Sequence, residues 1–125
     1  MRYLLDVNCL LAAIWRTHAN HALADAWVTG KDLATCPITE LGFLRISTHP
    51  KALNADMTSA RELLEDFLAK HAVASIPTDL PALKSLARNS DAVTDIYLAD
   101  LASAKGFKLA TLDRHISHPA VEIIA

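Results

Sequence analysis

The stretch Arg2-Tyr3-Leu4-Leu5-Asp6-Val7-Asn8 opens the chain with a short apolar run that ends on a carboxylate. We interpret residues 2–5 as a first buried strand, because a short apolar run that ends at a turn is typical of the strands of α/β proteins. In such proteins, ligands bind at the edge of the sheet where the strands have their carboxyl ends. Asp6 is therefore the first candidate for a functional residue.

Strand-like and helix-like segments alternate along the rest of the chain, which predicts a single α/β domain over residues 1–125. The further strands are expected at residues 33–36, 73–76, 108–112 and 121–124. Helices are expected at residues 8–15, 21–29 and 38–47, after a capping box at residues 59–62, from residues 79–81 onward, and from a cap at Thr94 to Gly106.

Three later acids share the position of Asp6 at the end of a strand or the start of a helix. Glu40 and Asp95 fall in the first turns of expected helices, and Asp113 follows an expected strand. Each acid alone could be a helix cap, a partner of the helix dipole or a turn residue. If the strands are parallel, however, all four meet at one edge, where a divalent cation would offset their mutual repulsion. The pattern therefore predicts a metal site.

Asp100 is expected to lie outside this site. It follows Asp95 by five residues, which corresponds to a rotation of about 140° around a helix. The two side chains therefore point to different faces of the same helix.

Composition narrows the classes of function. The net charge of −2, from 12 Lys and Arg against 14 Asp and Glu, excludes nucleic-acid binding by bulk positive charge. Any such contact must be local, and basic residues that could provide it include Arg45, Arg88, Arg114 and His115. No apolar run approaches the roughly 18 residues of a membrane helix, and no signal peptide is apparent, so we expect a cytoplasmic protein with no membrane association. Cys9 and Cys36 are expected to be buried thiols.

Four segments of the sequence, in this order, resemble the PIN-domain family and, within it, the VapC-type ribonuclease toxins of toxin–antitoxin systems. They are Tyr3-Leu4-Leu5-Asp6-Val7-Asn8, Cys36-Pro37-Ile38-Thr39-Glu40-Leu41-Gly42-Phe43-Leu44-Arg45, Thr94-Asp95-Ile96-Tyr97-Leu98-Ala99 and Leu109-Ala110-Thr111-Leu112-Asp113-Arg114. The resemblance extends over essentially the full length. It implies a central parallel sheet sandwiched by helices.

The resemblance also implies a function and a set of site residues. Asp6, Glu40, Asp95 and Asp113 match the four family acids, which would act as catalytic residues and as ligands of Mg²⁺ or Mn²⁺ in the hydrolysis of RNA. Many PIN domains have Ser or Thr where this chain has Asn8, for which we expect a supporting role. Basic residues near the acids are expected to contact the substrate, namely Arg45, Arg114 and His115. The expected partners are an RNA substrate, a second copy of the chain in a homodimer and a small VapB-like antitoxin.

Other interpretations stay open at this point. A non-toxin PIN nuclease of RNA processing would carry the same acids. A receiver domain would place its phosphoacceptor near Asp56, although residues 51–55 make a poor strand. A phosphatase of the haloacid-dehalogenase type would have an Asp in place of Asn8. A non-enzymatic binding module would bind no divalent metal at millimolar concentration.

Overall fold

The computed structural model, which describes residues 1–125, has a central sheet of five parallel strands. The strands are β1 (Arg2–Leu5), β2 (Asp32–Thr35), β3 (Ala74–Ser75), β4 (Lys108–Thr111) and β5 (Val121–Ile123). Their order across the sheet is β3-β2-β1-β4-β5. This arrangement confirms the α/β fold with a parallel sheet.

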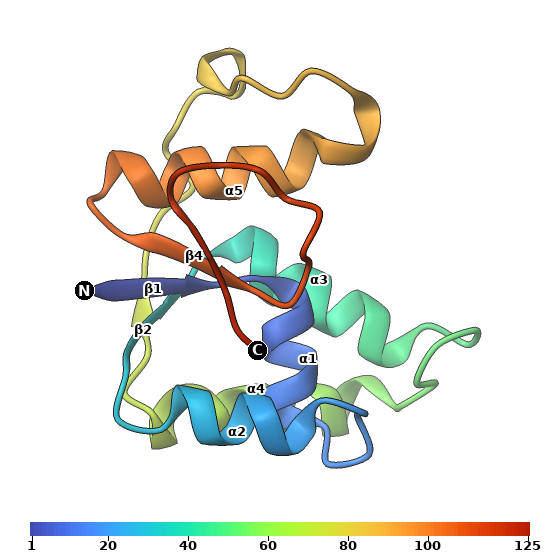
Figure 1. Ribbon diagram of the computed structural model, residues 1–125. Helices are drawn as coiled ribbons and strands as arrows, with labels where there is room; N and C mark the ends of the chain where they lie inside the picture. Colours follow the sequence, from blue (N-terminus) through green and yellow to red (C-terminus); the bar gives the residue numbers. More distant parts are fainter.

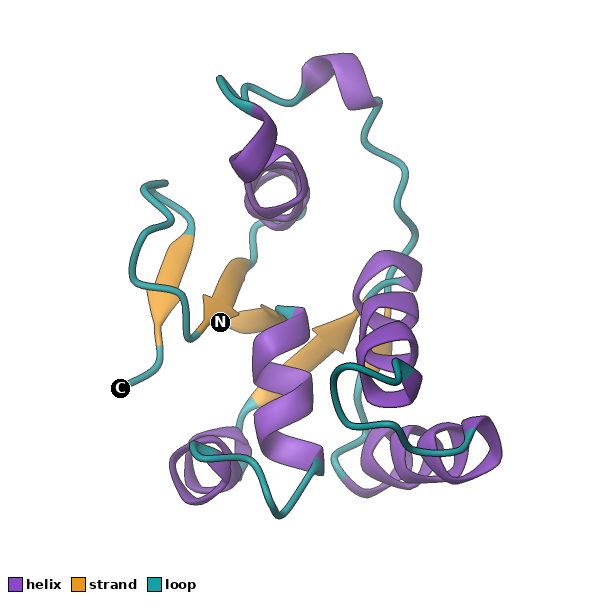
Figure 2. Cartoon of the chain, turned by 90° about the vertical axis from the view of Figure 1, so that its right-hand side faces the viewer, coloured by secondary structure: helices purple, strands orange, loops and turns teal.

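Helices cover both faces of the sheet. They are α1 (Val7–Ile14), α2 (His21–Val28), α3 (Pro37–Thr48), α4 (Met57–Lys70) and α5 (Val93–Ala104), with single 3₁₀ turns at Ala82–Lys84 and Ser90–Ala92. Helix α5 lies alone on one face, whereas α1, α2 and α4 lie on the other (Figures 1 and 2). Helix α3 packs beside α1 and α4. None of the helices has the length and the apolar composition that crossing a membrane requires.

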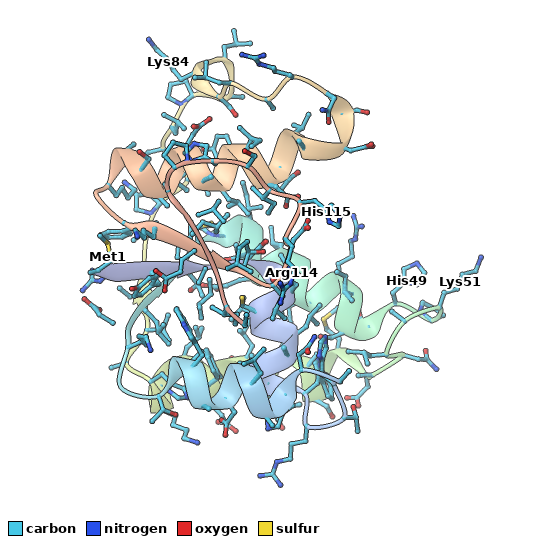
Figure 3. All side chains as sticks on the ribbon, in the orientation of Figure 1. Met1, His49, Lys51, Lys84, Arg114 and His115 are labelled. Carbon is cyan, nitrogen blue, oxygen red and sulfur yellow. The ribbon has the colours of Figure 1, made fainter.

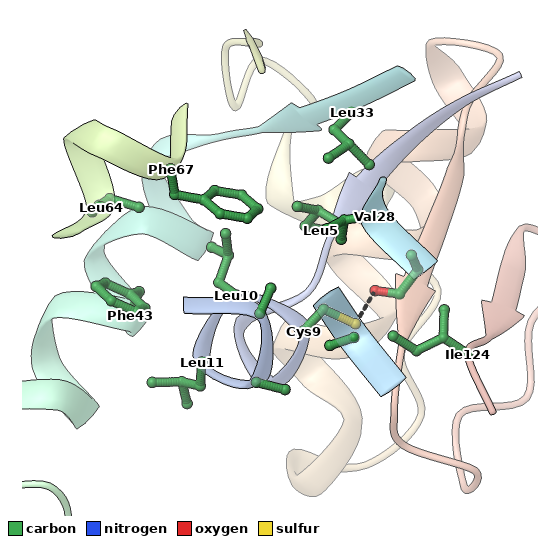
Figure 4. Close-up of a cluster of buried hydrophobic side chains, with 14 residues drawn as sticks. Leu5, Cys9, Leu10, Leu11, Val28, Leu33, Phe43, Leu64, Phe67 and Ile124 are labelled. Atoms are coloured by element: carbon green, nitrogen blue, oxygen red, sulfur yellow. Dashed lines mark hydrogen bonds between the residues drawn. The ribbon is translucent and has the colours of Figure 1, made fainter. Parts of the chain in front are cut away.

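The core is divided into two layers by the alternation of side chains along the strands. Leu4 and Leu109 pack with α5, whereas Leu5 and Ala110 pack with α1, α2, α3 and α4. This is the period of two that a strand imposes. Figure 4 shows the larger layer, in which the Cys9 thiol donates a hydrogen bond to the carbonyl of Ala110 at 3.2 Å. As expected, the two cysteines are free and buried.

The strand order places a topological switch point beside β1. From β1 the chain moves outward through β2 to β3, and it then crosses back to β4 on the other side of β1. The connections that leave β1 and enter β4 therefore lie on opposite faces of the sheet, which opens a crevice at the carboxyl ends of these strands. Asp6 follows β1 directly, and Asp113 lies two residues after the end of β4.

Three local predictions were wrong. Helix α4 is not opened by the capping box at residues 59–62, because Asp56 caps it and accepts a hydrogen bond from the Ser59 amide at 3.0 Å. Asp56 is therefore not at the end of a strand, where a receiver domain needs its phosphoacceptor. Thr94 does not cap α5, which begins one residue earlier, at Val93.

The third wrong prediction is the helix expected from residues 79–81 onward. Only the 3₁₀ turn at Ala82–Lys84 forms there, and the rest of the segment from Pro77 to Asn89 is irregular. Leu83 is 98% exposed and Leu86 is 76% exposed. A helix of this length is stabilised mainly by burying its apolar face, and this segment buries neither leucine.

Gly42 allows α3 to approach α1 closely. A Cβ atom at Gly42 would lie 2.5 Å from Cγ2 of Val7, a β-branched side chain with little freedom to move. Gly42→Ala should therefore lower the free energy of unfolding, since overpacking costs about 1–3 kcal/mol and the better helix propensity of Ala returns at most about 1 kcal/mol. Denaturant unfolding checks this.

The control is a second change at the contact. Adding Val7→Ala to Gly42→Ala removes the clashing methyl groups, so the double variant should be more stable than Gly42→Ala alone. If Val7→Ala brought no recovery, the close approach of the two helices would not be the cause.

Candidate active site

Asp6 is fixed at the end of β1 by hydrogen bonds to both carboxylate oxygens. It is only 5% exposed and caps α1, with Oδ1 accepting from the Val7 amide at 2.8 Å. Oδ2 accepts from the Thr111 hydroxyl at 2.8 Å. Burial, and to a lesser extent the negative charge of Asp113, raise the pKa of Asp6, although these hydrogen bonds oppose the rise. The carboxylate is thus held in one orientation, and burial and the nearby Asp113 make its charged form unfavourable.

Thr111, the last residue of β4, joins the first and fourth acids. Its hydroxyl proton goes to Asp6, and its oxygen accepts from the Asn8 side-chain amide at 3.1 Å and from the backbone amide of Asp113 at 3.0 Å. The Asn8 carbonyl in turn accepts from the Leu112 amide at 3.1 Å. Asn8 therefore orients Thr111 and the turn after β4, and through Thr111 it orients Asp6.

Asp113 lies in this turn and is paired with a histidine. Its Oδ1 accepts from the His115 backbone amide at 2.9 Å and lies 3.2 Å from Nδ1 of the His115 ring. The ring itself is almost fully exposed. Figure 3 shows Arg114 and His115 at the end of the sheet where β1 and β4 finish.

Asp95 faces this group from the first turn of α5. Burial raises its pKa first of all, and the negative charges of Asp6 and Asp113 raise it further. Asp6 and Asp113 therefore lie close enough to Asp95 for their charges to disfavour its charged form.

Glu40 is held separately on the other side of β1. It lies in the first turn of α3, and its Oε2 accepts from the Thr35 hydroxyl at 2.7 Å. Thr35 is the last residue of β2 and is buried. The structure thus orients Glu40 by the same kind of contact that holds Asp6.

Two buried threonines are the functional residues that the sequence analysis missed. Strands β2 and β4, which flank β1, both end on the same tripeptide, Leu33-Ala34-Thr35 and Leu109-Ala110-Thr111. Both hydroxyls donate to an acid of the site. A signal was present in the sequence, because a polar residue at the last position of an apolar strand needs a hydrogen-bond partner once it is buried.

The donor set suits a hard divalent cation. None of the four acids forms an ion pair with lysine or arginine, and only Asp113 has a histidine beside it. The structure does not draw three or more of these side chains into a ready ligand cluster. Mg²⁺ keeps several of its waters and takes only one or two protein carboxylates directly. Oxygen donors with uncompensated negative charge therefore fit such an ion.

Two grooves meet at Asp95. The inner groove, of about 560 Å³, lies between α1 and α3 and is lined by Asp6, Asn8, Arg45 and Asp95 among others. The outer groove, of about 500 Å³, is lined by residues of the segments 86–96 and 113–117. Of the expected substrate contacts, Arg45 lines the inner groove and His115 the outer one. Arg114 is exposed but lines neither of these two grooves.

The raised pKa of Asp95 has a consequence for stability. The charged form of Asp95 is less favourable in the folded protein than in the unfolded chain. The contribution of the Asp95 side chain to stability is therefore fully present below the ordinary pKa of 3.8 and is lost as the pH rises through the raised pKa. Asp95→Asn should therefore raise the Tm at pH 7 in the presence of EDTA. The gain should shrink towards about pH 4, where the wild-type acid takes up its proton. Thermal unfolding at the two pH values checks this, and an equal gain at both would contradict it.

The fold and site together define a class of protein: an α/β domain with acids at the carboxyl edge of a parallel sheet, suited to metal-dependent chemistry. The sequence profile of the PIN domain matches residues 3–122. The chain belongs to the PIN-domain family.

Named relatives agree with this assignment. The chain is 37% identical over 123 residues to Ribonuclease VapC38 of Mycobacterium tuberculosis strain H37Rv, covering 88% of this chain and 84% of the relative. It is 35% identical over 133 residues to Ribonuclease VapC39 of the same strain, covering 96% and 94%. The fold is similar to a chain in the crystal structure of VapBC2 from Rickettsia felis bound to a promoter DNA fragment. The TM-score is 0.65 at 16% identity, with 98% of each chain covered.

Proposed function

We propose that this protein is a metal-dependent endoribonuclease that acts as the toxin of a type II toxin–antitoxin module. The observation that carries the proposal is the group of Asp6, Asp95 and Asp113, whose charges oppose one another without a lysine or arginine to offset them. Relatives that span most of the chain are named Ribonuclease VapC, which supports RNA as the substrate.

The proposed reaction is hydrolysis of an RNA phosphodiester bond. Asp6, Asp95 and Asp113 would hold Mg²⁺ or Mn²⁺, with Glu40 completing the site directly or through water. When bound, the ion supplies an activated water and offsets the charge that develops on the phosphate. Thr111 and Thr35 keep two of the acids in place.

Basic residues beside the acids are suited to hold the RNA. Arg45 lies in the inner groove and His115 in the outer groove, on either side of Asp95. Phosphates on both sides of the reacting bond could be bound in this way, with Arg114 as a further contact at the rim. The small number of cations agrees with local binding rather than bulk attraction.

A small VapB-like antitoxin and a second copy of the chain are the proposed protein partners, in the cytoplasm. The similar fold in a VapBC complex supports the first partner. An antitoxin arginine could pair bidentately with the unpaired carboxylates and so compete with the metal. Exposed apolar side chains offer surface for protein contacts, notably Leu41, Leu83, Leu86 and Val93.

Expression in bacteria tests the function. The wild-type chain and Asp6→Asn are expressed separately from an inducible promoter, and total RNA is examined by primer extension. The wild type should arrest growth and create new RNA ends, whereas Asp6→Asn should do neither, because Asn keeps the helix cap but removes the charge. Arrest by both proteins alike, or arrest without new RNA ends, would contradict a nuclease toxin and favour a binding module.

A further inference from the structure

Asp100 connects helix α5 to a segment that precedes it and to a segment that follows β4. From the middle of α5, its Oδ1 lies 2.7 Å from Nε2 of His118, and its Oδ2 accepts from the Leu86 amide at 3.1 Å. Both side chains of this hydrogen-bonded contact are largely buried, at 16% exposure for Asp100 and 14% for His118. The contact thus connects the segment before α5 and the segment after β4 to the helix between them. We call this set of contacts the clamp.

The geometry defines the proton positions in the clamp. Nδ1 of His118 accepts from the Ala120 amide at 3.0 Å, so this nitrogen carries no proton. The ring proton is therefore on Nε2 and is donated to the carboxylate of Asp100. Burial on its own would raise the pKa of Asp100, but the hydrogen bonds from His118 and Leu86 more than offset this and keep it below the usual range. A charged acceptor makes these bonds stronger than neutral ones.

The two segments that the clamp holds are the two walls of the outer groove. One wall runs from Leu86 to Ala92 and carries Arg88; the other runs from Asp113 to Ser117 and carries His115. Neither wall belongs to the sheet, and the first contains only a single 3₁₀ turn. Asp100 itself lines neither the inner nor the outer groove.

Other ties between α5 and the first of these segments lie further from Arg88. The Tyr97 hydroxyl donates to the carbonyl of Leu80 at 2.7 Å, and Lys105 pairs with Asp79 at 3.0 Å. Both contacts hold residues 79–80, which lie six or more residues before the start of the groove wall at Leu86. The bond from Leu86 to Asp100 is therefore the tie at the wall itself.

We propose that Asp100 and His118 are positioning residues that keep the outer groove in shape as a subsite for RNA on one side of the reacting phosphodiester. The proposal rests on the ribonuclease function proposed above. Arg88 on one wall and His115 on the other face the same groove, and both are exposed. Loss of the clamp lets the walls move, so only a fraction of molecules presents both residues at once, and the apparent affinity for RNA falls by that fraction.

The test compares Asp100→Ala and His118→Ala with a matched control, Asp79→Ala, which removes an exposed ion pair from the same segment. Cleavage of total bacterial RNA is measured as initial rate against RNA concentration. We expect the clamp variants to raise KM roughly tenfold and to change kcat by less than about twofold, because the acids themselves are untouched. The control should match the wild type.

Two further variants and one measurement guard against general loss of structure. His118→Gln keeps an amide that can donate to Asp100 and should recover most of the affinity, whereas Asp100→Asn loses the charge and should not. Hydrogen exchange of the Leu86 amide should accelerate in the clamp variants and stay at the wild-type rate in the control.

The outcomes separate this proposal from the function on which it rests. A wild type that cleaves no RNA would contradict the ribonuclease itself. If the wild type cleaves RNA but the clamp variants have an unchanged KM, only the role of the clamp is overturned. The same holds if Asp79→Ala alters kcat and KM as much as the clamp variants do.

Discussion

Purified Asp95→Asn is expected to cleave RNA at least about a thousandfold more slowly than the wild type, since metal catalysis contributes several kcal/mol and each 1.36 kcal/mol is a factor of ten. Asp95 lies at the meeting point of both grooves and close to the charges of Asp6 and Asp113. Asn has nearly the same shape but removes one negative charge from the proposed ligand set. Cleavage of labelled total RNA in Mn²⁺ measures the loss.

The fold of this variant should be intact and somewhat more stable without metal, which separates a lost function from a lost structure. Asp66→Asn is the matched control, because Asp66 is an exposed acid on α4, outside both grooves. It should cleave RNA like the wild type. Full activity in Asp95→Asn, or an equal loss in Asp66→Asn, would exclude the proposed role of Asp95.

Thr111→Val should reduce cleavage about 10–100-fold, the usual cost of losing a residue that orients a metal ligand. The change also leaves a buried carboxylate oxygen and a backbone amide without a partner, which costs about 1–3 kcal/mol each. Valine has the same shape as threonine, so no cavity contributes. Steady-state cleavage together with denaturant unfolding measures both effects.

Thr111→Ser is the informative comparison, because it keeps the hydroxyl and removes only a methyl group. It should recover most of the activity. If the serine variant were as inactive as the valine variant, packing rather than the hydrogen bond to Asp6 would be responsible.

Much of the fold could be predicted from local patterns. The apolar runs at β1, β2 and β4 and the helices that follow β1 and β2 fall within a residue or two of their predicted bounds, because each segment buries one side or both in a core. Gly30 and Gly106, at φ of 76° and 74°, end helices as expected.

The segment before α5 could not be predicted by the same reasoning. Its leucines have helical spacing, but periodicity does not reveal whether a partner surface exists, and here it does not. Its position depends on contacts with α5 through Tyr97, Asp100 and Lys105, which are distant in sequence. The helical period predicts that Asp100 points away from Asp95, and Asp100 lines neither groove, but its contact with His118 could not be foreseen.

The site also combines features that local sequence predicts with features that depend on contacts between distant residues. The sequence placed four acids at strand and helix ends, and the structure brings Asp6, Asp95 and Asp113 within reach of one another's charge. Glu40 is oriented on its own by the Thr35 hydroxyl, at 2.7 Å. The orienting role of Thr111 depends on the pairing of β1 with β4, which is a contact over 100 residues of sequence and has no local signature.

In the proposed site, the acids at the carboxyl edge of the sheet bind a divalent metal ion. Thermal unfolding with EDTA and with several millimolar Mn²⁺ tests this binding most directly. An ion that binds only the folded protein raises the free energy of unfolding by mass action, so Mn²⁺ should raise the Tm of the wild type. It should leave the Tm of the double variant Asp6→Asn, Asp95→Asn unchanged relative to EDTA. No shift in the wild type, or an equal shift in the double variant, would contradict a metal site built from these acids.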